Sequence, residues 1–151
     1  MENTKYMLIL KIDEENYALS INDIDRTIQA LEITKLPDTP PTILGVINYH
    51  GQIIPVINMR KLFNLPEKEI DLTDIFVIAN TSKRKLCLVV DGTSEVIKYS
   101  QKDVVDKSNI SKGLKPIKEL INHEGNILLI YDLDSFISLE EDEVFEKAMN
   151  K

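Results

Sequence analysis

Two pairs of carboxylates stand at spacings that general acid–base chemistry can use. Asp132 and Asp134 lie in the stretch YDLDSF, and Asp91 and Glu95 lie in VVDGTSEV. In either pair one carboxyl group could act as the acid and the other as the base. However, Asp-x-Asp at a strand end is typical of a turn or helix start, where Asp caps free amides. Asp-Gly likewise indicates a turn that leaves Glu95 on the following strand. An acid–base enzyme therefore stays an alternative hypothesis.

Metal ligands and nucleophiles are scarce in this sequence. The only histidines are His50 and His123, and neither is followed by a ligand-type residue at i+3 or i+4, whereas zinc needs three or four ligands. The single cysteine, Cys87, lies in the apolar run KLCLVVD, which favours a buried, inert thiol over a catalytic one. No phosphate-binding glycine loop and no G-x-S-x-G motif occurs. We therefore predict no catalytic residues, no metal and no cofactor.

Composition and charge narrow the class of protein further. The chain has 151 residues, 43% of them apolar, which suits one domain or two tightly fused small units. A formal net charge of −7 argues against a surface that binds the phosphates of nucleic acids. No apolar run reaches the roughly 18 residues of a membrane span, and the N-terminus lacks the basic region of a signal peptide. These features predict a cytoplasmic protein without direct membrane insertion.

The elements that would position such residues are mostly short strands. Apolar runs bounded by turn residues predict strands at 6–12, 17–21, 74–80, 85–91, 94–100 and the start of 126–137. The spacing of Ile21, Ile24 and Ile28 shifts to i, i+3, i+7, which predicts a short helix or helical turn over 21–28. Extended structure is predicted for 28–36, a short helix for 59–65 and a loop for the polar stretch 101–118.

The stretch LGVINYHGQIIPVINMR, residues 44–60, predicts a β-hairpin with a tight turn at His50-Gly51. Glycine at position 51 suits a backbone with positive φ. Pro55 has no N–H for a ladder, so its strand lies at an edge, at a bulge, or is paired on one side only there. Asn48 and His50 are polar side chains that an apolar hairpin does not explain. Each therefore needs a partner, inside the fold or outside it.

The basic cluster and the C-terminal segment have local interpretations. The cluster Lys83-Arg84-Lys85 stands between two predicted strands and is interpreted as a solvated hairpin tip. Ser138 and Glu141 form the S-x-x-E capping-box pattern. An acidic amphipathic helix is therefore predicted over 139–151, after a domain of residues 1–138. Its apolar side, which favours packing on the domain over partner binding, comprises Leu139, Val144, Phe145, Ala148 and Met149.

Many short strands and few helices indicate small β-barrels or a sandwich, and the order of motifs adds a resemblance. The stretch GVINYHGQIIPVINMRKLF is similar to a G-V-x-N-x-R-G hairpin that leads into I-x-P-V-x-D-L-R. LCLVVDGTSEVIKYS matches V-D-x-V-x-E-V, and GNILLIYDLDSFI matches a final G-x-I-x-x-L-D-L strand and helix. Over residues 6–138 the chain thus resembles the CheW family, the adaptor domain of chemotaxis systems.

The resemblance implies a mainly β fold of two small SH3-like β-barrels around a shared hydrophobic core, with short helices and a C-terminal helix. It also implies a non-enzymatic adaptor that couples the cytoplasmic tip of a chemoreceptor to the regulatory domain of a CheA-type histidine kinase. In the family, receptor binding is attributed to the groove between the barrels and kinase binding to a barrel end. The partner-binding residues expected here are Ile24, Arg26, Val46, Asn48, His50, Gly51, Val90, Asp91 and Glu95.

Several positions depart from the family pattern. The arginine before the turn glycine is His50 here, the common glutamate of the early segment falls on Arg26, and the aspartate of I-D-L-R is Asn58. A guanidinium is a permanent five-donor fork, whereas histidine is shorter and carries fewer donors. These changes leave the fold expectation intact and are those of a divergent adaptor. A small-molecule-binding barrel, and a barrel that acts by homo-oligomerisation alone, stay as alternatives.

Overall fold

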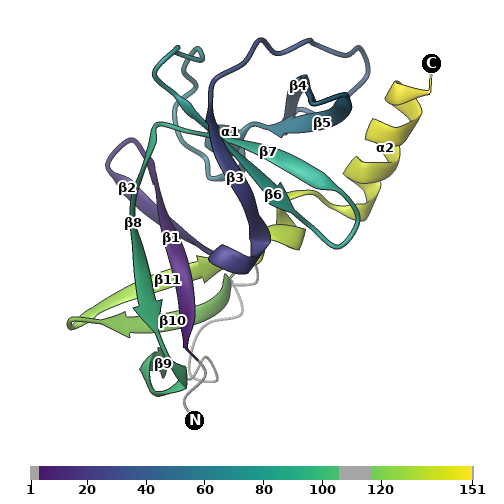
Figure 1. The fold of residues 1–151 in the computed structure, drawn as a ribbon. Helices are drawn as coiled ribbons and strands as arrows, with labels where there is room; N and C mark the ends of the chain where they lie inside the picture. Colours follow the sequence, from purple (N-terminus) through teal and green to yellow (C-terminus); the bar gives the residue numbers. More distant parts are fainter. Residues whose placement is uncertain (1–3, 106–116, 151) are drawn as a thin grey trace.

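The strands form two antiparallel-rich sheets, each curled into a small barrel (Figure 1). The computed structural model describes residues 4–105 and 117–150. The first barrel has the strand order β8-β1-β2-β11-β10-β9, with β1 Lys5–Ile12, β2 Glu15–Ser20, β8 Gly92–Tyr99, β9 Val104–Val105, β10 Ile117–His123 and β11 Asn126–Tyr131. The second has the order β3-β6-β7-β5-β4, with β3 Ile24–Gln29, β4 Ile43–Tyr49, β5 Gln52–Ile57, β6 Ile75–Asn80 and β7 Lys85–Val90.

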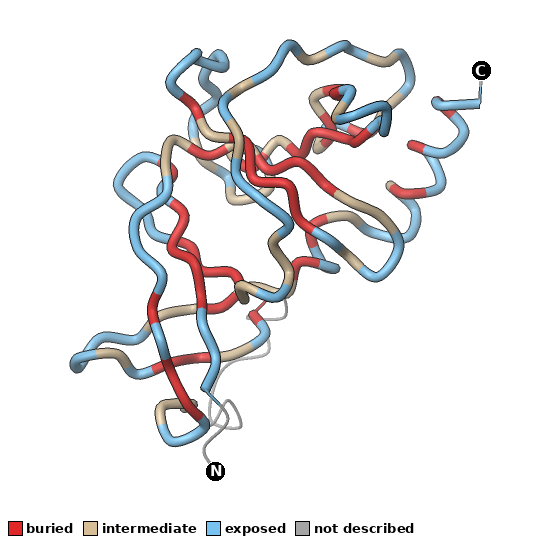
Figure 2. Tube along the Cα trace, viewed as in Figure 1, coloured by how far each residue is buried: buried red, intermediate tan, exposed pale blue. Residues whose placement is uncertain are grey.

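A shared core joins the two barrels, as the resemblance implied. Along β1, Met7 and Ile9 pack inside the first barrel, whereas Leu8 and Leu10 face the second barrel. Successive side chains of a strand point to opposite faces, so a strand that is buried on both faces needs an unbroken apolar run. The run YMLILKI of residues 6–12 meets this need, and β1 is buried along most of its length (Figure 2).

The central strands of the second barrel follow the same rule. Phe76 and Ile78 of β6 lie inside that barrel, and Val77 and Ala79 contribute to the shared core. The shared core therefore receives side chains from both sheets, and the barrels form one packed unit. This confirms the mainly β fold of two barrels around a common hydrophobic core.

The second barrel closes through a short bridge outside its regular strands. The backbone N–H of Val46 donates to the carbonyl of Thr34 at 2.8 Å, and the N–H of Thr34 donates to the carbonyl of Val46 at 2.9 Å. Gly45 lies directly beneath this bridge with φ +155°, and a Cβ atom there would stand 2.4 Å from the Thr34 carbonyl oxygen. Only glycine allows the two backbones to approach this closely.

The predicted helix over 21–28 is wrong beyond its first residues. A 3-10 turn spans only Ile21–Asp23 (η1), and Ile24 already begins β3, which pairs with β6. The register of this pair shifts between Ile24 and Arg26. This bulge breaks the period of two and puts Ile24 against the shared core, whereas Ile28 packs inside the second barrel. The irregular spacing that suggested a helix is thus the mark of a bulged strand.

The predicted loop over 101–118 is also partly wrong. A 3-10 turn at Gln101–Asp103 (η2) and strand β9 follow β8, and β10 begins at Ile117. The part of the prediction at 106–116 lies outside the described residues. The sequence prediction missed β10 because its stretch IKELINH places polar residues among few apolar ones, and a register shift between Ile117 and Glu119 interrupts the alternation.

The remaining helices lie where the sequence placed them. The short helix α1 spans Met59–Leu62, and the side chain of Asn58 caps it by accepting the N–H of Lys61 at 3.1 Å. The turn η5 spans Leu133–Phe136, and α2 spans Leu139–Met149 with the predicted capping box of Ser138 and Glu141.

The C-terminal helix packs on the domain through part of its predicted apolar side. Phe145 and Ala148 are buried, and Phe145 joins the shared core. Leu139 is 67% exposed, and Val144 and Met149 are also exposed. The helix therefore contacts the second barrel along a narrower stripe than its composition indicated.

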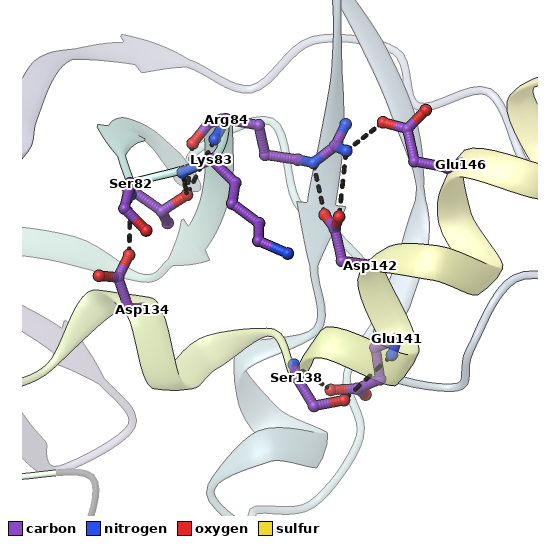
Figure 3. Close-up of polar contacts among 9 residues, drawn as sticks. Ser82, Lys83, Arg84, Asp134, Ser138, Glu141, Asp142 and Glu146 are labelled. Atoms are coloured by element: carbon purple, nitrogen blue, oxygen red, sulfur yellow. Dashed lines mark hydrogen bonds and ion pairs between the residues drawn. The ribbon is translucent and has the colours of Figure 1, made fainter.

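The interpretation of Lys83-Arg84-Lys85 as a solvated tip is wrong for two of its three residues. The Arg84 guanidinium pairs with Asp142 at 2.6 Å and with Glu146 (Figure 3). It also lies 5.0 Å from the ring centroid of Phe145. Lys85 pairs with Asp25 at 3.2 Å. The sequence did not reveal these contacts because their partners lie 60 or more positions away or on a helix whose docking face was unknown.

Gly45→Ala is expected to destabilise the fold. A residue with a Cβ would meet the Thr34 carbonyl and would occupy a strained backbone conformation, which costs about 1–3 kcal/mol or more. Urea unfolding monitored by circular dichroism measures the change. Gly92→Ala is the matched control, because a Cβ atom there meets nothing within 4 Å. Equal stability of the two variants would contradict the close approach at Gly45.

Asp142→Ala is expected to loosen α2. The Arg84 side chain is 21% exposed and would lose its main acceptor, which costs roughly 1–3 kcal/mol when the partner stays unpaired. Hydrogen exchange of the α2 amides and urea unfolding measure the loss. Glu143→Ala, an exposed change on the same helix, is the control and should leave both unchanged. Unaltered α2 protection in Asp142→Ala would contradict a contribution of the Arg84–Asp142 pair to the docking of the helix.

Candidate functional site

The β4–β5 turn has the predicted geometry at His50 and Gly51. Their φ angles are +51° and +84°, so both central residues of the turn adopt the positive φ of a tight hairpin. The side chain of Asn48 accepts the N–H of Gly51 at 2.9 Å. Asn48 therefore has its hydrogen-bond partner within the fold, and its polar side chain is explained by the turn.

Arg26 of β3 lies beside the same turn. Its guanidinium carbon is 5.8 Å from the ring centroid of Tyr49. The ring of His50 packs edge-on against Tyr49, with the two ring centroids 4.4 Å apart. We call Arg26, Asn48, Tyr49, His50 and Gly51 the hairpin patch. Tyr49 was missing from the expected site, although an aromatic residue directly before the turn was visible in the sequence. Four of the nine expected residues thus come together here.

Three other expected site residues are apolar and contribute to the shared core. Val46 is 6% exposed and Val90 is 1% exposed, and half-buried Ile24 packs against the same cluster. In this structure their side chains support the barrels from inside. A partner would reach them only indirectly, through the strands that carry them.

Asp91 lies in a charged network that the sequence did not indicate. Arg60 on α1 donates to Asp91 at 3.0 Å and to Asp13 at 2.9 Å and 3.0 Å, and the backbone N–H of Asp13 donates to Asp91 at 2.6 Å. Partial burial raises the pKa of Asp91, but the bonds from Asp13 and Arg60 outweigh it and hold this pKa below its usual range. Asp91 is therefore an ionised structural group and a poor general acid or base at neutral pH.

The second candidate carboxylate pair is also structural. Asp132 caps η5 by accepting the N–H of Asp134 at 3.1 Å. Asp134 accepts the N–H of Ser82 at 2.9 Å and so connects η5 to the β6–β7 turn (Figure 3). Each carboxylate accepts a hydrogen bond from a backbone amide, as the capping interpretation predicted. The acid–base alternative finds no support at this pair.

Glu95 lies away from both the hairpin patch and Asp91. It belongs to β8, where the register against β1 shifts between Thr93 and Val96, and its side chain is exposed. A bulge of this kind bends an edge strand and re-aims its side chains. Glu95 is therefore a solvent-facing charge on the first barrel, whereas the hairpin patch belongs to the second (Figure 1).

The strand of Pro55 is paired on one side only at this residue, which is one of the three arrangements predicted for it. Pro55 pairs with Val46 of β4, but the parallel ladder between β5 and β7 begins only at Val56. The missing N–H of proline therefore costs no ladder hydrogen bond.

The first barrel exposes an apolar strip beside the shared core. Val96 of β8 is 53% exposed and stands directly opposite Leu8 of β1, and Tyr6, two positions before Leu8, is 43% exposed. Directly paired residues share a face, so this strip continues the surface of the shared core outward. Two exposed apolar side chains on one face of paired strands form a small apolar surface here. We call Tyr6 and Val96 the apolar strip.

The described residues offer little for metal or thiol chemistry. No group of three or more His, Cys, Asp or Glu residues within 4–105 and 117–150 could hold a metal ion. Cys87 is fully buried, and burial raises the pKa of its thiol to about 12. A cleft of about 460 Å³ beside α1 is lined by side chains of both charge signs. In the described part of the chain, no helix has the length and apolarity to span a membrane.

The architecture is thus two fused barrels around a shared core, with Asp91, Asp132 and Asp134 engaged in ion pairs and caps. The chain belongs to the family of CheW-like domains, whose model matches residues 6–144. At the level of this family, CheW proteins are chemotaxis scaffolds and adaptors and not enzymes.

Individual relatives agree with this assignment. The chain is 30% identical over 132 residues to the chemotaxis protein CheW of Thermotoga maritima, covering 87% of this chain and 86% of the relative. It is 26% identical over 139 residues to the chemotaxis protein CheA of Borreliella burgdorferi, covering 89% of this chain and 15% of the relative. The crystal structure of the scaffolding protein TtCheW from Thermoanaerobacter tengcongensis is similar with a TM-score of 0.80 at 25% identity, covering 92% of this chain and 96% of that one.

Asp91→Asn is expected to flatten the acid limb of the stability curve. Because the folded pKa of Asp91 is depressed, its contribution is present above the unfolded pKa of about 4 and is lost as pH falls through the folded value. Urea unfolding between pH 7 and pH 2 should therefore show a shallower decline below about pH 4 in the variant. Glu95→Gln, at an exposed carboxylate, is the control. An unchanged acid slope in Asp91→Asn would contradict the network.

Proposed function

We propose that this protein is a non-enzymatic signalling adaptor that couples the cytoplasmic tip of a chemoreceptor to the regulatory domain of a CheA-type histidine kinase. It would act in the cytoplasm, without nucleic acid and without inserting into a membrane. The observation that carries the proposal is the family match over residues 6–144.

The similarity to a stretch of CheA supports the kinase as one partner. That stretch is 15% of the kinase but aligns with 89% of this chain, so the relative contains a domain of comparable size. Two domains of one fold can pair through equivalent barrel ends, much as identical subunits pair in symmetric assemblies. The hairpin patch, with Arg26 and His50 exposed at one end of the second barrel, is our candidate for this contact.

The apolar strip is our candidate for the receptor contact. A helical receptor tip presents apolar side chains at helical spacing, and such a helix binds along a hydrophobic surface between packed elements. Val96 is exposed opposite Leu8, which belongs to the shared core, and Tyr6 is exposed two positions before Leu8 on β1. Glu95, the neighbour of Val96, would then lie at the edge of this contact.

The departures at Arg26 and His50 bear on partner choice. A cation at position 26 favours a carboxylate on the partner, and histidine at position 50 removes a bidentate donor that the family pattern offers. We infer that the cognate partner is adapted to this reversed charge. Specificity of this kind arises from contacts that repel the wrong partner as well as from those that attract the right one.

Binding to purified partners tests the proposal. The full chain is mixed with the kinase regulatory domain, or with a receptor tip fragment, encoded in the same genome, and complexes are detected by gel filtration with light scattering. Co-elution with either partner supports an adaptor. If the folded protein binds neither at tens of micromolar, or only self-associates, the adaptor proposal is wrong for these partners.

Substitutions then separate the two surfaces. Arg26→Glu and His50→Ala are expected to weaken kinase binding several-fold, because each removes a donor at the hairpin patch. Val96→Asp is expected to weaken receptor binding, because it places a charge on the apolar strip. Glu140→Lys, an exposed change on α2, is the control. Circular dichroism confirms folding, and unchanged affinity in a variant would remove its residue from the contact.

A further inference from the structure

Arg60 connects elements of both barrels at one point. It lies on α1, directly after β5 of the second barrel. Its first acceptor, Asp13, is in the turn between β1 and β2 of the first barrel, and its second, Asp91, is at the crossover between β7 and β8. The chain passes from one barrel to the other at this crossover (Figure 1). A single guanidinium thus joins the two barrels and the segment that links them.

The geometry uses the full donor capacity of the two terminal nitrogens. Nη1 donates to Asp13 at 3.0 Å and to the carbonyl of Pro66 at 3.1 Å. Nη2 donates to Asp13 at 2.9 Å and to Asp91 at 3.0 Å. The Arg60 side chain is only 12% exposed. A planar fork with fixed donor directions defines an orientation, which a lysine ammonium at the same place would not do.

The charges of the three side chains make this contact stronger than an ordinary neutral hydrogen bond. Two carboxylates, Asp13 and Asp91, face one guanidinium, and the N–H of Asp13 donates to Asp91 at 2.6 Å. Without the cation these two carboxylates would repel each other in a partly desolvated setting. Backbone hydrogen bonds, from the Asp91 N–H to the Lys11 carbonyl at 2.8 Å and from the Asp13 N–H to Asp91, keep the turn and the crossover together. Loss of the guanidinium would therefore remove the charged contact between this part of the first barrel and α1.

Arg60 adds a constraint of a different kind from that of the shared core. Apolar burial is non-directional, so the fixed donor directions of the guanidinium add an orientation to the close packing of the core. Directional contacts from α1 lie at the border of this core. Besides Arg60, Phe63 at the end of α1 packs on Tyr17 of β2, with ring centroids 4.4 Å apart. The short α1 thus holds the β1–β2 hairpin through one polar and one aromatic contact.

We propose that Arg60, with Asp13 and Asp91, is an inter-barrel tie that sets the orientation of the first barrel relative to the second. Arg60 acts as a positioning residue: it orients the strands that carry the apolar strip without being part of it. The consequence for receptor binding rests on the proposed function, whereas the orientation itself is a property of the isolated chain and is measured without a partner.

A distance measurement between the barrels tests this proposal. Spin labels are attached at Asn126→Cys on β11 and Gln29→Cys on β3, two exposed positions on different barrels. The native Cys87 is fully buried and does not compete for the label. With Arg60 present, a single narrow distance distribution is expected. Arg60→Ala is expected to shift and broaden this distribution while circular dichroism retains the β signal.

Two further variants complete the experiment. Asp13→Asn keeps Arg60 on Asp91 and is expected to produce a smaller change in the same direction, which also covers the case that Arg60→Ala fails to fold. Arg84→Ala removes an ion pair that lies wholly between the second barrel and α2 and is expected to leave the distribution unchanged. The proposal is overturned if Arg60→Ala, or Asp13→Asn where it alone folds, matches the native distribution. It is equally overturned if Arg84→Ala broadens the distribution as much.

Discussion

A single apolar layer between two curved sheets is the constraint on which the rest of this structure depends. Strands β1, β6 and β7 send alternate side chains into it and into their own barrels. A strand that serves two cores must be apolar at nearly every position, which leaves no room there for ionisable groups. The polar chemistry of the chain is therefore displaced to the borders of the layer, in turns, crossovers and helix ends.

The charged residues at these borders stabilise junctions instead of forming an active site. Arg60 connects the β1–β2 turn to the β7–β8 crossover, and Arg84 connects the β6–β7 turn to α2. Both guanidinium groups meet two carboxylates at the edge of the shared core. Directional ion pairs at the edge of a non-directional core give such a fold a defined shape. For a protein whose proposed activity is to hold two partners in one arrangement, a defined shape is the functional requirement.

The surfaces left for partners are of two kinds. The hairpin patch is cationic and aromatic and lies at one end of the second barrel, whereas the apolar strip belongs to β1 and β8 of the first. Their different chemistry suits two different partners, and their location on separate barrels would let both bind at once. The orientation of the barrels then becomes the link between the two contacts, which is why a residue such as Arg60 can matter without touching a partner.

The sequence by itself determined the β class, the hairpin turn at His50-Gly51, the inert Cys87 and the capping box at Ser138, because each depends on neighbours within a few positions. It also carried the family resemblance, through motif order. Only the tertiary structure decided that Asp91 pairs with Arg60, that Arg84 holds α2, that Val46 and Val90 face inward, and that 24–29 is a bulged strand. These outcomes depend on residues 30 to 80 positions apart, which come together only when the barrels close. A pattern of neighbouring residues cannot predict which distant residues will pair.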